Sequence, residues 1–253
     1  MENDQYALED KLEIVEIIQR SKQGATQPFV CRGEDDNLYF VKGKSAGRKS
    51  VIAEYVCGCL AKNWGLPIAD FKIVNVPDAL IENALIPDIH ELGVGLAFGS
   101  ESVKYTQEIQ YSQIQKVDLK IRKDILVFDW WVRNGDRILT ENGGNPNLLW
   151  DQQSKQVVVI DHNVAFEEPF DCSLFQESHI FRDLIPVVFE DWVDRYEYTD
   201  RLNVVFAELD KICNNVPPEW WYVDDGVPAS LNPDMIKGIL SSFRQDCFWE
   251  VKI

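Results

Sequence analysis

Apolar and polar positions alternate through the first part of the chain and predict strands there. Residues 11–19, KLEIVEIIQ, are mostly apolar and β-branched. Two shorter apolar runs follow, QPFVCR and NLYFVKG, on either side of the turn-forming residues GEDDN. Such runs between turn residues are typical of antiparallel hairpins. These three runs predict a small antiparallel sheet, and a further run at 69–77, ADFKIVNVP, predicts another strand.

The period of the hydrophobic pattern changes at residues 48–64, RKSVIAEYVCGCLAKNW. Apolar side chains recur there at helical spacing, at positions 51, 52, 55, 56, 59 and 60. This spacing predicts a helix, and the GLP that follows predicts its end. The glycine-rich residues 89–100, IHELGVGLAFGS, are expected to be irregular.

Helical spacing dominates the second half of the chain. Residues 117–134, VDLKIRKDILVFDWWVRN, have apolar side chains at 121, 125, 128 and 132 and predict a helix. The runs NLLW and QVVVI flank DQQSK and predict a hairpin. From about residue 185 to the end the pattern is mostly helical, with breaks at NNVPPEWW and DDGVPASLNP.

These elements predict an α+β fold with two lobes and a cleft between them. We expect an N-lobe at residues 1–100, made of the small antiparallel sheet and one helix. We expect a mostly helical C-lobe at residues 101–253, which would contain the hairpin and the segment before it.

Composition narrows the function classes. The 253 residues, 45% of them hydrophobic, suffice to bury a core in one large domain or two lobes. The formal net charge of −17 argues against binding to nucleic acid or to an anionic membrane. No apolar run approaches the roughly 18 residues of a membrane span, and the acidic start resembles neither a signal nor a transit peptide. The six scattered cysteines favour thiols in a reducing cytosol, so we expect a cytoplasmic protein.

Two residues in the first part fit the binding of a nucleotide's phosphates. Phosphoryl transfer needs a lysine on a sheet and an acid on a neighbouring helix to hold it. Lys42 ends a predicted strand, and Glu54 lies twelve residues later on the predicted helix. The alternative is a solvated strand end and an exposed helix residue. Lys44 would lie on the same face of the strand as Lys42 and is a rival for this role.

A loop between the first two predicted strands is a second candidate for phosphate binding. Residues 20–29, RSKQGATQPF, contain one glycine, Gly24, with Ala25 and Thr26 beside it. Backbone N–H groups in such a turn can bind phosphate oxygens. An ordinary hairpin loop has the same composition.

Two aspartates in the second half are candidates for the chemistry itself. Asp136 follows the long predicted helix in RNGDR, where it could accept a hydroxyl proton. Asn134-Gly135 is equally typical of the turn that ends a helix. Asp161 ends a VVVI run that we expect to be buried on both faces, where a carboxylate costs several kcal/mol unless it is paired or binds a metal. A capping role in the next turn is the alternative.

The predicted hairpin suggests a partner for Asp161. Asn147 begins the first strand of that hairpin, and Asp161 follows the second. The two side chains can therefore approach one ion, and Mg²⁺ prefers one or two carboxylates together with substrate phosphates.

Taken together, these motifs resemble the HipA-like kinase family in a compact form without extra domains. The resemblance covers about residues 12–166. It is carried, in this order, by RSKQGATQPFVCR, YFVKGKSAGRKSVIAEYVCGCLAKNWGLPIADF, AFGS, RNGDR with NPNLLW, and VIDHNVAF. It implies a two-lobed fold similar to that of protein kinases, the use of ATP and Mg²⁺, and transfer to serine or threonine.

The resemblance also implies a role for each candidate residue. Lys42 corresponds to the lysine that binds phosphate, and Glu54 corresponds to its partner. Asp136 corresponds to the catalytic base, and Asn147 and Asp161 correspond to the metal ligands.

Two further segments take a role from the resemblance. Phe98, Gly99 and Ser100 match the segment that contacts adenine in the family. Some relatives phosphorylate a serine in their own phosphate loop, and Ser21 and Thr26 are the hydroxyls of the equivalent stretch.

The chain departs from the kinase pattern in two places. The interval from Asp136 to Asn147 is eleven residues, whereas protein kinases place the asparagine about five residues after the aspartate. ILTENGG therefore looks partly inserted, and Asn142 and Asn145 compete for the metal role. Asp161 is followed by HN where ordinary protein kinases have FG.

The resulting hypothesis is an ATP- and Mg²⁺-dependent serine/threonine protein kinase. Relatives include toxins that phosphorylate aminoacyl-tRNA synthetases, so an unidentified protein of translation is a candidate substrate and an antitoxin or regulatory protein a candidate partner. One alternative is a catalytically inactive interaction protein from a toxin–antitoxin pair. Another is a small-molecule kinase or AMP transferase on the same fold.

Overall fold

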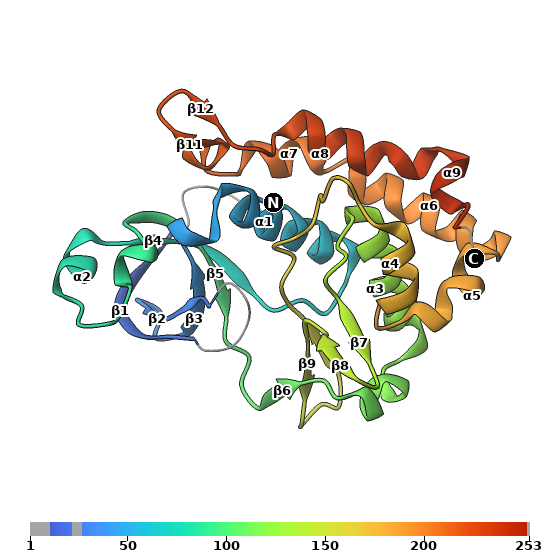
Figure 1. The fold of residues 1–253 in the computed structure, drawn as a ribbon, viewed down its shortest axis with the longest axis horizontal. Coiled ribbons are helices and arrows are strands. Elements are labelled where there is room, and N and C mark those ends of the chain that lie inside the picture. Colours follow the sequence, from blue (N-terminus) through green and yellow to red (C-terminus); the bar gives the residue numbers. More distant parts are fainter. Residues whose placement is uncertain (1–10, 22–26, 252–253) are drawn as a thin grey trace, which may run out of the picture. The chain divides into compact units, whose positions relative to one another are not determined.

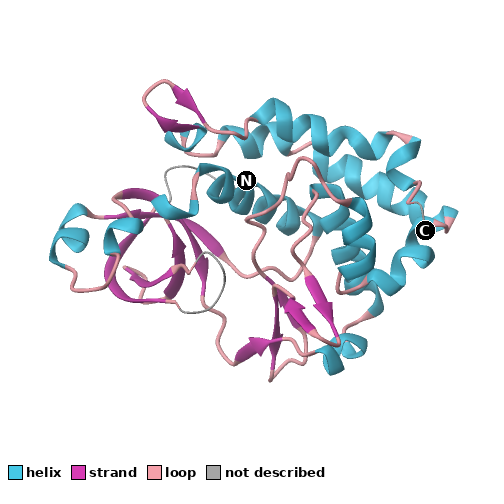
Figure 2. Ribbon diagram, viewed as in Figure 1, coloured by secondary structure: helices cyan, strands magenta, loops and turns pink. Residues whose placement is uncertain are grey.

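A computed structural model describes residues 11–21 and 27–251, and it has a mixed α+β fold (Figures 1 and 2). The chain divides into two compact units. Unit 1 consists of Met1–Val56, Ala69–Val103 and Ile212–Asn232, and unit 2 consists of Cys57–Ile68, Lys104–Lys211 and Pro233–Ile253. The two-lobed arrangement and the boundary at residue 100 stay predictions.

The main sheet of unit 1 is a closed barrel of five strands (Figure 1). In barrel order these strands are β1 (Leu12–Arg20), β2 (Phe29–Gly33), β3 (Leu38–Lys42), β5 (Gly95–Glu101) and β4 (Phe71–Val76). The predicted strands and the antiparallel pairing of the first three are confirmed, but the small sheet is a closed barrel that includes one parallel pair. A parallel pair between β1 and β4 closes the barrel, and closure leaves no free sheet edge there.

β5 corrects a second prediction, because it occupies part of the segment expected to be irregular. It pairs with both β3 and β4 along its length. Its glycine at position 99 is needed for close packing, since a Cβ atom there would lie 2.8 Å from Cγ1 of Val74. The glycines that suggested an irregular loop therefore allow a strand to fit inside a crowded barrel.

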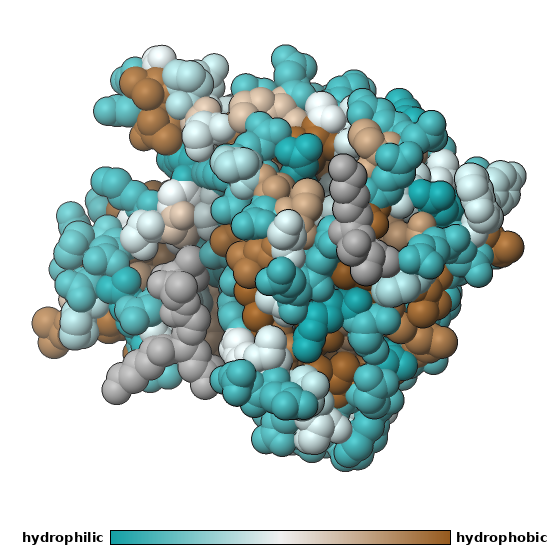
Figure 3. Space-filling model, turned by 45° about the vertical axis from the view of Figure 1, so that its right-hand side comes forward, coloured by the Kyte–Doolittle hydropathy of each residue, from teal (hydrophilic) through white to brown (hydrophobic). Residues whose placement is uncertain are grey.

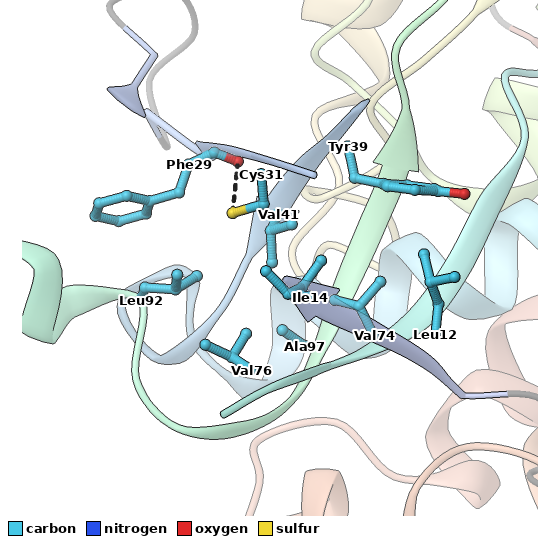
Figure 4. Packing of buried hydrophobic residues seen from close by; sticks show 10 residues of the cluster. All are labelled: Leu12, Ile14, Phe29, Cys31, Tyr39, Val41, Val74, Val76, Leu92 and Ala97. Atoms are coloured by element: carbon cyan, nitrogen blue, oxygen red, sulfur yellow. Dashed lines mark hydrogen bonds between the residues drawn. The ribbon is translucent and has the colours of Figure 1, made fainter. Parts of the chain in front are cut away.

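Side chains from all five strands form the core of the barrel (Figure 4). Neighbouring strand residues point to opposite faces, so Tyr39 and Val41 point inward and Lys42 points outward. The core cluster consists of Leu12, Ile14, Phe29, Cys31, Tyr39, Val41, Val74, Val76, Leu92 and Ala97.

Helix α1 (Arg48–Trp64) has the predicted bounds. Every residue from 50 to 61 is buried, so the helix is covered on all sides and not only along an apolar stripe. It belongs to unit 1 up to Val56 and to unit 2 from Cys57. The remaining elements of unit 1 are α2 (Asp78–Asn83), the hairpin β11 (Tyr222–Asp224) and β12 (Val227–Pro228), and the 3₁₀ helices η1 (Lys44–Ala46), η2 (Ile89–Glu91) and η5 (Pro218–Trp221).

Unit 2 contains the predicted helix α3 (Leu119–Val132) and the predicted hairpin. That hairpin is β9 (Leu148–Asp151) with β10 (Val157–Val159), and β6 (Thr106–Glu108) pairs with β9 on its other side. A second, shorter hairpin joins β7 (Ile138–Thr140) to β8 (Gly143–Asn145).

The tail is mostly helical, as predicted, except for the hairpin β11–β12. Its helices are α4 (Cys172–Ser178), α5 (Ile185–Phe189), α6 (Trp192–Phe206), α7 (Leu209–Asn214), α8 (Pro233–Leu240) and α9 (Asp246–Trp249), with η3 (Tyr111–Lys116), η4 (Arg182–Leu184) and η6 (Ser241–Arg244) as 3₁₀ helices of unit 2. Among the described residues, no helix has the length and apolar character needed to cross a membrane. The face in Figure 3 is hydrophilic over much of its area, with hydrophobic patches between.

Candidate active site

Lys42 and Glu54 form a buried ion pair in unit 1. The Nζ atom of Lys42 donates a hydrogen bond to Oε1 of Glu54 on α1, and the side chains are only 7% and 4% exposed. The alternative of two solvent-exposed residues is therefore wrong. Lys44 lies on η1 and is exposed, so Lys42 is the lysine that meets the helix glutamate.

Phe98 and Gly99 lie within β5, which pairs on both sides. Phe98 is directly opposite Lys42 in the β3–β5 pairing, so the two side chains share the outer face of the barrel. The ring of Phe98 stacks on that of Phe71 at a centroid distance of 5.6 Å. Gly99 faces the barrel interior beside Val74. Contact of these residues and Ser100 with adenine stays a prediction.

The candidate phosphate loop is described only at its two ends. Gly24, Ala25 and Thr26 lie outside the described residues. Ser21 is within them, and its N–H donates to the carbonyl of Pro28 at 2.8 Å, which joins the two ends of the loop. Phosphorylation of Ser21 or Thr26 stays a prediction.

The segment that carries Asp136 begins as a helix C-terminal turn. Arg133 is in the left-handed conformation, with φ of 54°, and its N–H caps α3. Asn134 is fully buried and donates from Nδ2 to Oδ1 of Asp129 at 2.9 Å. The helix-ending turn at Asn134-Gly135, which the sequence offered as the alternative to a functional role, is therefore present. Asp136 follows directly after it.

The lengthened interval after Asp136 is a hairpin. β7 pairs with β8 so that Ile138 is opposite Asn145. The chain therefore leaves Asp136 and returns to it, and the Nδ2 atoms of Asn145 and Asn147 lie 2.7 and 3.2 Å from Oδ2 of Asp136. Gly144 permits this path, because a Cβ atom there would lie 2.3 Å from the carbonyl oxygen of Ile138.

The three candidate asparagines are not equivalent. Asn142 lies in the exposed turn at the tip of the β7–β8 hairpin. Asn145 and Asn147 both bind Asp136, but Asn145 is exposed whereas Asn147 is only 7% exposed. When an amide nitrogen binds a carboxylate, its carbonyl oxygen remains available to a cation. Asn145 and Asn147 therefore both stay candidate metal ligands.

Asp136 has an electrostatic environment suited to a base. Burial raises the pKa of its carboxyl group, the hydrogen bonds from Asn147 and Asn145 act in the opposite direction, and the nearby charge of Asp161 raises it further. A raised pKa makes the carboxylate a better proton acceptor. The effect of Asp161 also shows that the two carboxylates are close enough to interact.

Asp161 follows β10 in the left-handed conformation, with φ of 58°. Val158 and Ile160 are only partly buried, so the expectation of a strand buried on both faces is wrong, and Asp161 itself is half-buried. The N–H of Ile160 donates to the carbonyl of Asn147 at 3.1 Å, which extends the β9–β10 pairing to the two candidate metal ligands. The hairpin thus brings Asn147 beside the residue preceding Asp161, and the approach of both side chains to one ion stays a prediction.

The residues around Asp136 and Asp161 fit Mg²⁺. They supply two carboxylates and the amide oxygens of Asn145 and Asn147, which are hard oxygen ligands. A further buried oxygen, Oδ1 of Asn163, has no hydrogen-bond partner among the described residues. In that same part of the chain no cluster of three or more His, Cys, Asp and Glu side chains occurs, so a site built entirely from such residues is not seen. Mg²⁺ usually needs only one or two carboxylates, because substrate phosphates and water complete its shell.

A buried polar network next to this site was not predicted from the sequence. Arg137 and Asp129 are fully buried and paired, with Nε of Arg137 2.6 Å from Oδ2 of Asp129. Nε2 of His179 lies 3.0 Å from the same oxygen, and His162 is also buried. The available signal was an acid, Asp129, inside the apolar run LVFDWW, because an isolated carboxylate there requires a buried partner.

The histidine of this network makes stability depend on pH. Burial lowers the pKa of His179 against the opposing effect of Asp129, so the folded protein holds it neutral. Below its ordinary pKa of about 6.5 the unfolded chain takes up a proton that the folded protein does not. We expect the free energy of unfolding to fall as pH drops below about 6.5, by up to about 1.4 kcal/mol per pH unit from this group.

Urea denaturation of the wild type and of His179→Gln between pH 8 and pH 5 measures this contribution. The glutamine cannot take up the proton, so the difference in stability between the two proteins should shrink as pH falls. Parallel curves for the two proteins would contradict the prediction.

Comparison with known proteins gives one family match and several structural likenesses. A family model described as HipA-like kinase matches residues 14–252. Among solved structures, a proinflammatory kinase of Helicobacter pylori, CtkA, is similar at 12% identity over 91% of this chain and 92% of that one, with a TM-score of 0.49. CtTel1 in its open conformation is similar at 16% identity over 90% of this chain but only 11% of that one, with a TM-score of 0.30.

The structural likenesses are too weak to support an argument about function. Comparison with curated protein sequences gave no match. The family model, in contrast, spans nearly all of the chain, from the first strand to the last helix. This protein therefore belongs to the HipA-like kinase family.

Proposed function

We propose that this protein is an ATP- and Mg²⁺-dependent kinase that transfers the γ-phosphoryl group to a serine or threonine hydroxyl of a protein. Membership of the HipA-like kinase family supports kinase chemistry. The observation that carries the proposal is the arrangement in unit 2, where Asp136 accepts hydrogen bonds from Asn145 and Asn147 and interacts with Asp161.

Asp136 is the proposed general base. Its carboxylate would accept the hydroxyl proton of the acceptor as the oxygen attacks the γ-phosphorus and the bond to the leaving ADP breaks. Burial raises the pKa of Asp136 and so increases its basicity, while the amide donors hold its orientation. Most of the remaining work in phosphoryl transfer is positioning and charge stabilisation.

The other predicted residues would provide that positioning. Lys42, held in place by Glu54, would bind phosphate oxygens through its ammonium group. Asp161 and an amide oxygen of Asn147 or Asn145 would hold Mg²⁺. When bound, Mg²⁺ neutralises negative charge on the β- and γ-phosphates.

The acidic character of the chain supports a protein acceptor. A net charge of −17 favours acceptors with basic side chains and disfavours nucleic acid. A substrate from translation and an antitoxin or regulatory partner stay predictions from the family resemblance.

The direct test combines nucleotide binding with phosphate transfer. Thermal unfolding of the wild type is followed with ATP and Mg²⁺ and with ATP and EDTA, and labelled γ-phosphate is followed into the protein itself, casein and histone. Saturation at 100 times Kd should add about 2.7 kcal/mol of stability. A protein that is neither stabilised nor able to label any acceptor contradicts the proposal and favours an inactive interaction protein.

The asparagines provide a matched comparison within one hairpin. We expect Asn147→Ala to raise the Mg²⁺ concentration needed for half-maximal labelling by about 10-fold or more, since a ligand is lost. Asn142→Ala, at the exposed hairpin tip, should leave that concentration unchanged. Asn145→Ala decides between the two remaining candidates. If it raises this Mg²⁺ concentration more than Asn147→Ala does, Asn145 is the metal ligand.

A further inference from the structure

Arg137 is fully buried next to Asp136, and all five of its N–H donors are used. Nε donates to Oδ2 of Asp129 at 2.6 Å, and Nη2 approaches Oδ1 of the same carboxylate at 3.3 Å. Nη2 also lies 3.2 Å from Nε2 of His162. Nη1 donates to the carbonyl oxygens of Asn147 at 2.5 Å and of Ile160 at 3.2 Å.

Of the two carbonyls bound by Nη1, one belongs to a candidate metal ligand and the other to the residue before the second candidate. One is the carbonyl of Asn147 itself, and the other belongs to the peptide that joins Ile160 to Asp161. Both Asn147 and Asp161 have left-handed backbones, with φ of 47° and 58°. Asparagine and aspartate adopt this conformation more readily than other non-glycine residues do. A single nitrogen atom of Arg137 thus binds the backbone at both places.

Arg137 also contacts the far end of the segment that follows Asp161. The backbone carbonyl of Arg137 accepts a hydrogen bond from the N–H of Ile180 at 3.0 Å. The neighbouring His179 shares Oδ2 of Asp129 with the Arg137 side chain. Residues 161–180 are therefore joined to Arg137 near both of their ends.

We propose that Arg137 is the positioning residue that sets the distance between Asn147 and Asp161 and thereby the metal affinity of the site. The inference rests on the proposed function for the identity of the metal ligands. Arg137 would touch neither substrate nor metal. It would act through the backbone carbonyls, while Asp129 holds its guanidinium plane.

An arginine is required for this arrangement because of its shape. Five acceptor atoms surround its side chain, and a guanidinium can bind all of them with its fixed fork of donors. Lysine would keep the positive charge but could supply only three donors from a single nitrogen. Arg137→Lys therefore separates the geometric role from simple charge neutralisation of Asp129.

A second arginine–carboxylate pair in the same unit provides the control. Arg201 donates to Asp124 through both terminal nitrogens, at 2.6 and 3.1 Å. Its other contacts are with Trp64 and Tyr198, not with residues of the proposed metal site. Arg201→Lys should reduce stability without changing metal binding.

The experiment measures Mn²⁺ binding in the presence of ATP by electron paramagnetic resonance, together with kcat and KM for labelling and thermal unfolding. We expect Arg137→Lys to weaken Mn²⁺ binding by 10- to 100-fold, as loss of a residue supporting metal ligands does. Labelling should recover partly at high metal concentration, with KM for the protein acceptor little changed. Arg201→Lys should bind Mn²⁺ as the wild type does.

Other outcomes separate the two proposals. A folded Arg137→Lys that binds Mn²⁺ with wild-type affinity overturns the role of Arg137, even if the wild type labels its acceptor. Weakened Mn²⁺ binding without labelling by the wild type supports Arg137 but contradicts the kinase activity. If Arg137→Lys does not fold, His162→Phe removes one acceptor of the fork without a change in charge, and unchanged Mn²⁺ affinity in that variant overturns the proposal.

Discussion

Asp136→Asn should lower kcat for phosphoryl transfer by about 10³-fold while Mg²⁺-ATP still binds within a few-fold of its wild-type affinity. The substitution preserves the size of the side chain but removes its ability to take a proton. It leaves Asp161 and the buried Lys42–Glu54 pair unchanged. The effect should therefore appear in kcat, measured from initial rates of labelling, and only weakly in thermal stabilisation by nucleotide.

A matched control for this substitution is Asp151→Asn. Asp151 is a carboxylate of unit 2 that ends β9, and it accepts hydrogen bonds from the turn residues Gln153 and Ser154. Asp151 contacts none of Asp136, Asn145 and Asn147. The kcat of Asp151→Asn should therefore stay within about two-fold of the wild-type value. If Asp136→Asn keeps a tenth or more of wild-type kcat, Asp136 is not the base.

Lys42→Met should lower the free energy of unfolding by about 3–5 kcal/mol, because it removes the ammonium partner of a buried glutamate. Glu54 is only 4% exposed and cannot turn to solvent without disturbing α1. The double variant Lys42→Met/Glu54→Leu should recover most of that loss, because apolar side chains of similar volume commonly replace a buried ion pair at little cost. Neither variant should be stabilised by ATP.

Urea denaturation of the three proteins measures the stability effect, and thermal shifts with ATP measure binding. The control is Lys237→Met, which removes an exposed lysine paired with Asp210. An exposed pair contributes at most about 1 kcal/mol, so this variant should be close to the wild type. Nucleotide binding by the double variant would show that the pair is structural only.

Much of the local structure could be predicted from the order of residues. The strands at β1 to β4, helix α1 with its bounds, and the hairpin β9–β10 all follow from periodicity and turn residues, which act over a few positions. The types of the candidate residues also followed from the sequence, since Lys42, Asp136 and Asp161 each end or follow a recognisable element. The family resemblance added their roles.

The sequence did not predict features that depend on contacts between distant residues. The closure of the barrel by a parallel pair and the strand at β5 depend on which segments meet, and a glycine-rich stretch suits either a loop or a tightly packed strand. The extra residues after Asp136 were recognised as an insertion. Only the pairing of Ile138 with Asn145 shows that they return the chain to Asp136.

The sequence by itself therefore determined most of the elements, the family resemblance and the residue types available for chemistry. The tertiary structure decided which of them are buried and which meet. The structure separated Lys42 from its rival Lys44, because the glutamate on α1 binds the ammonium group of Lys42. Arg137 was overlooked because its importance lies in five hydrogen bonds to residues 8 to 25 positions away. Burial and such long-range hydrogen bonds arise from packing of the whole chain, which no local pattern specifies.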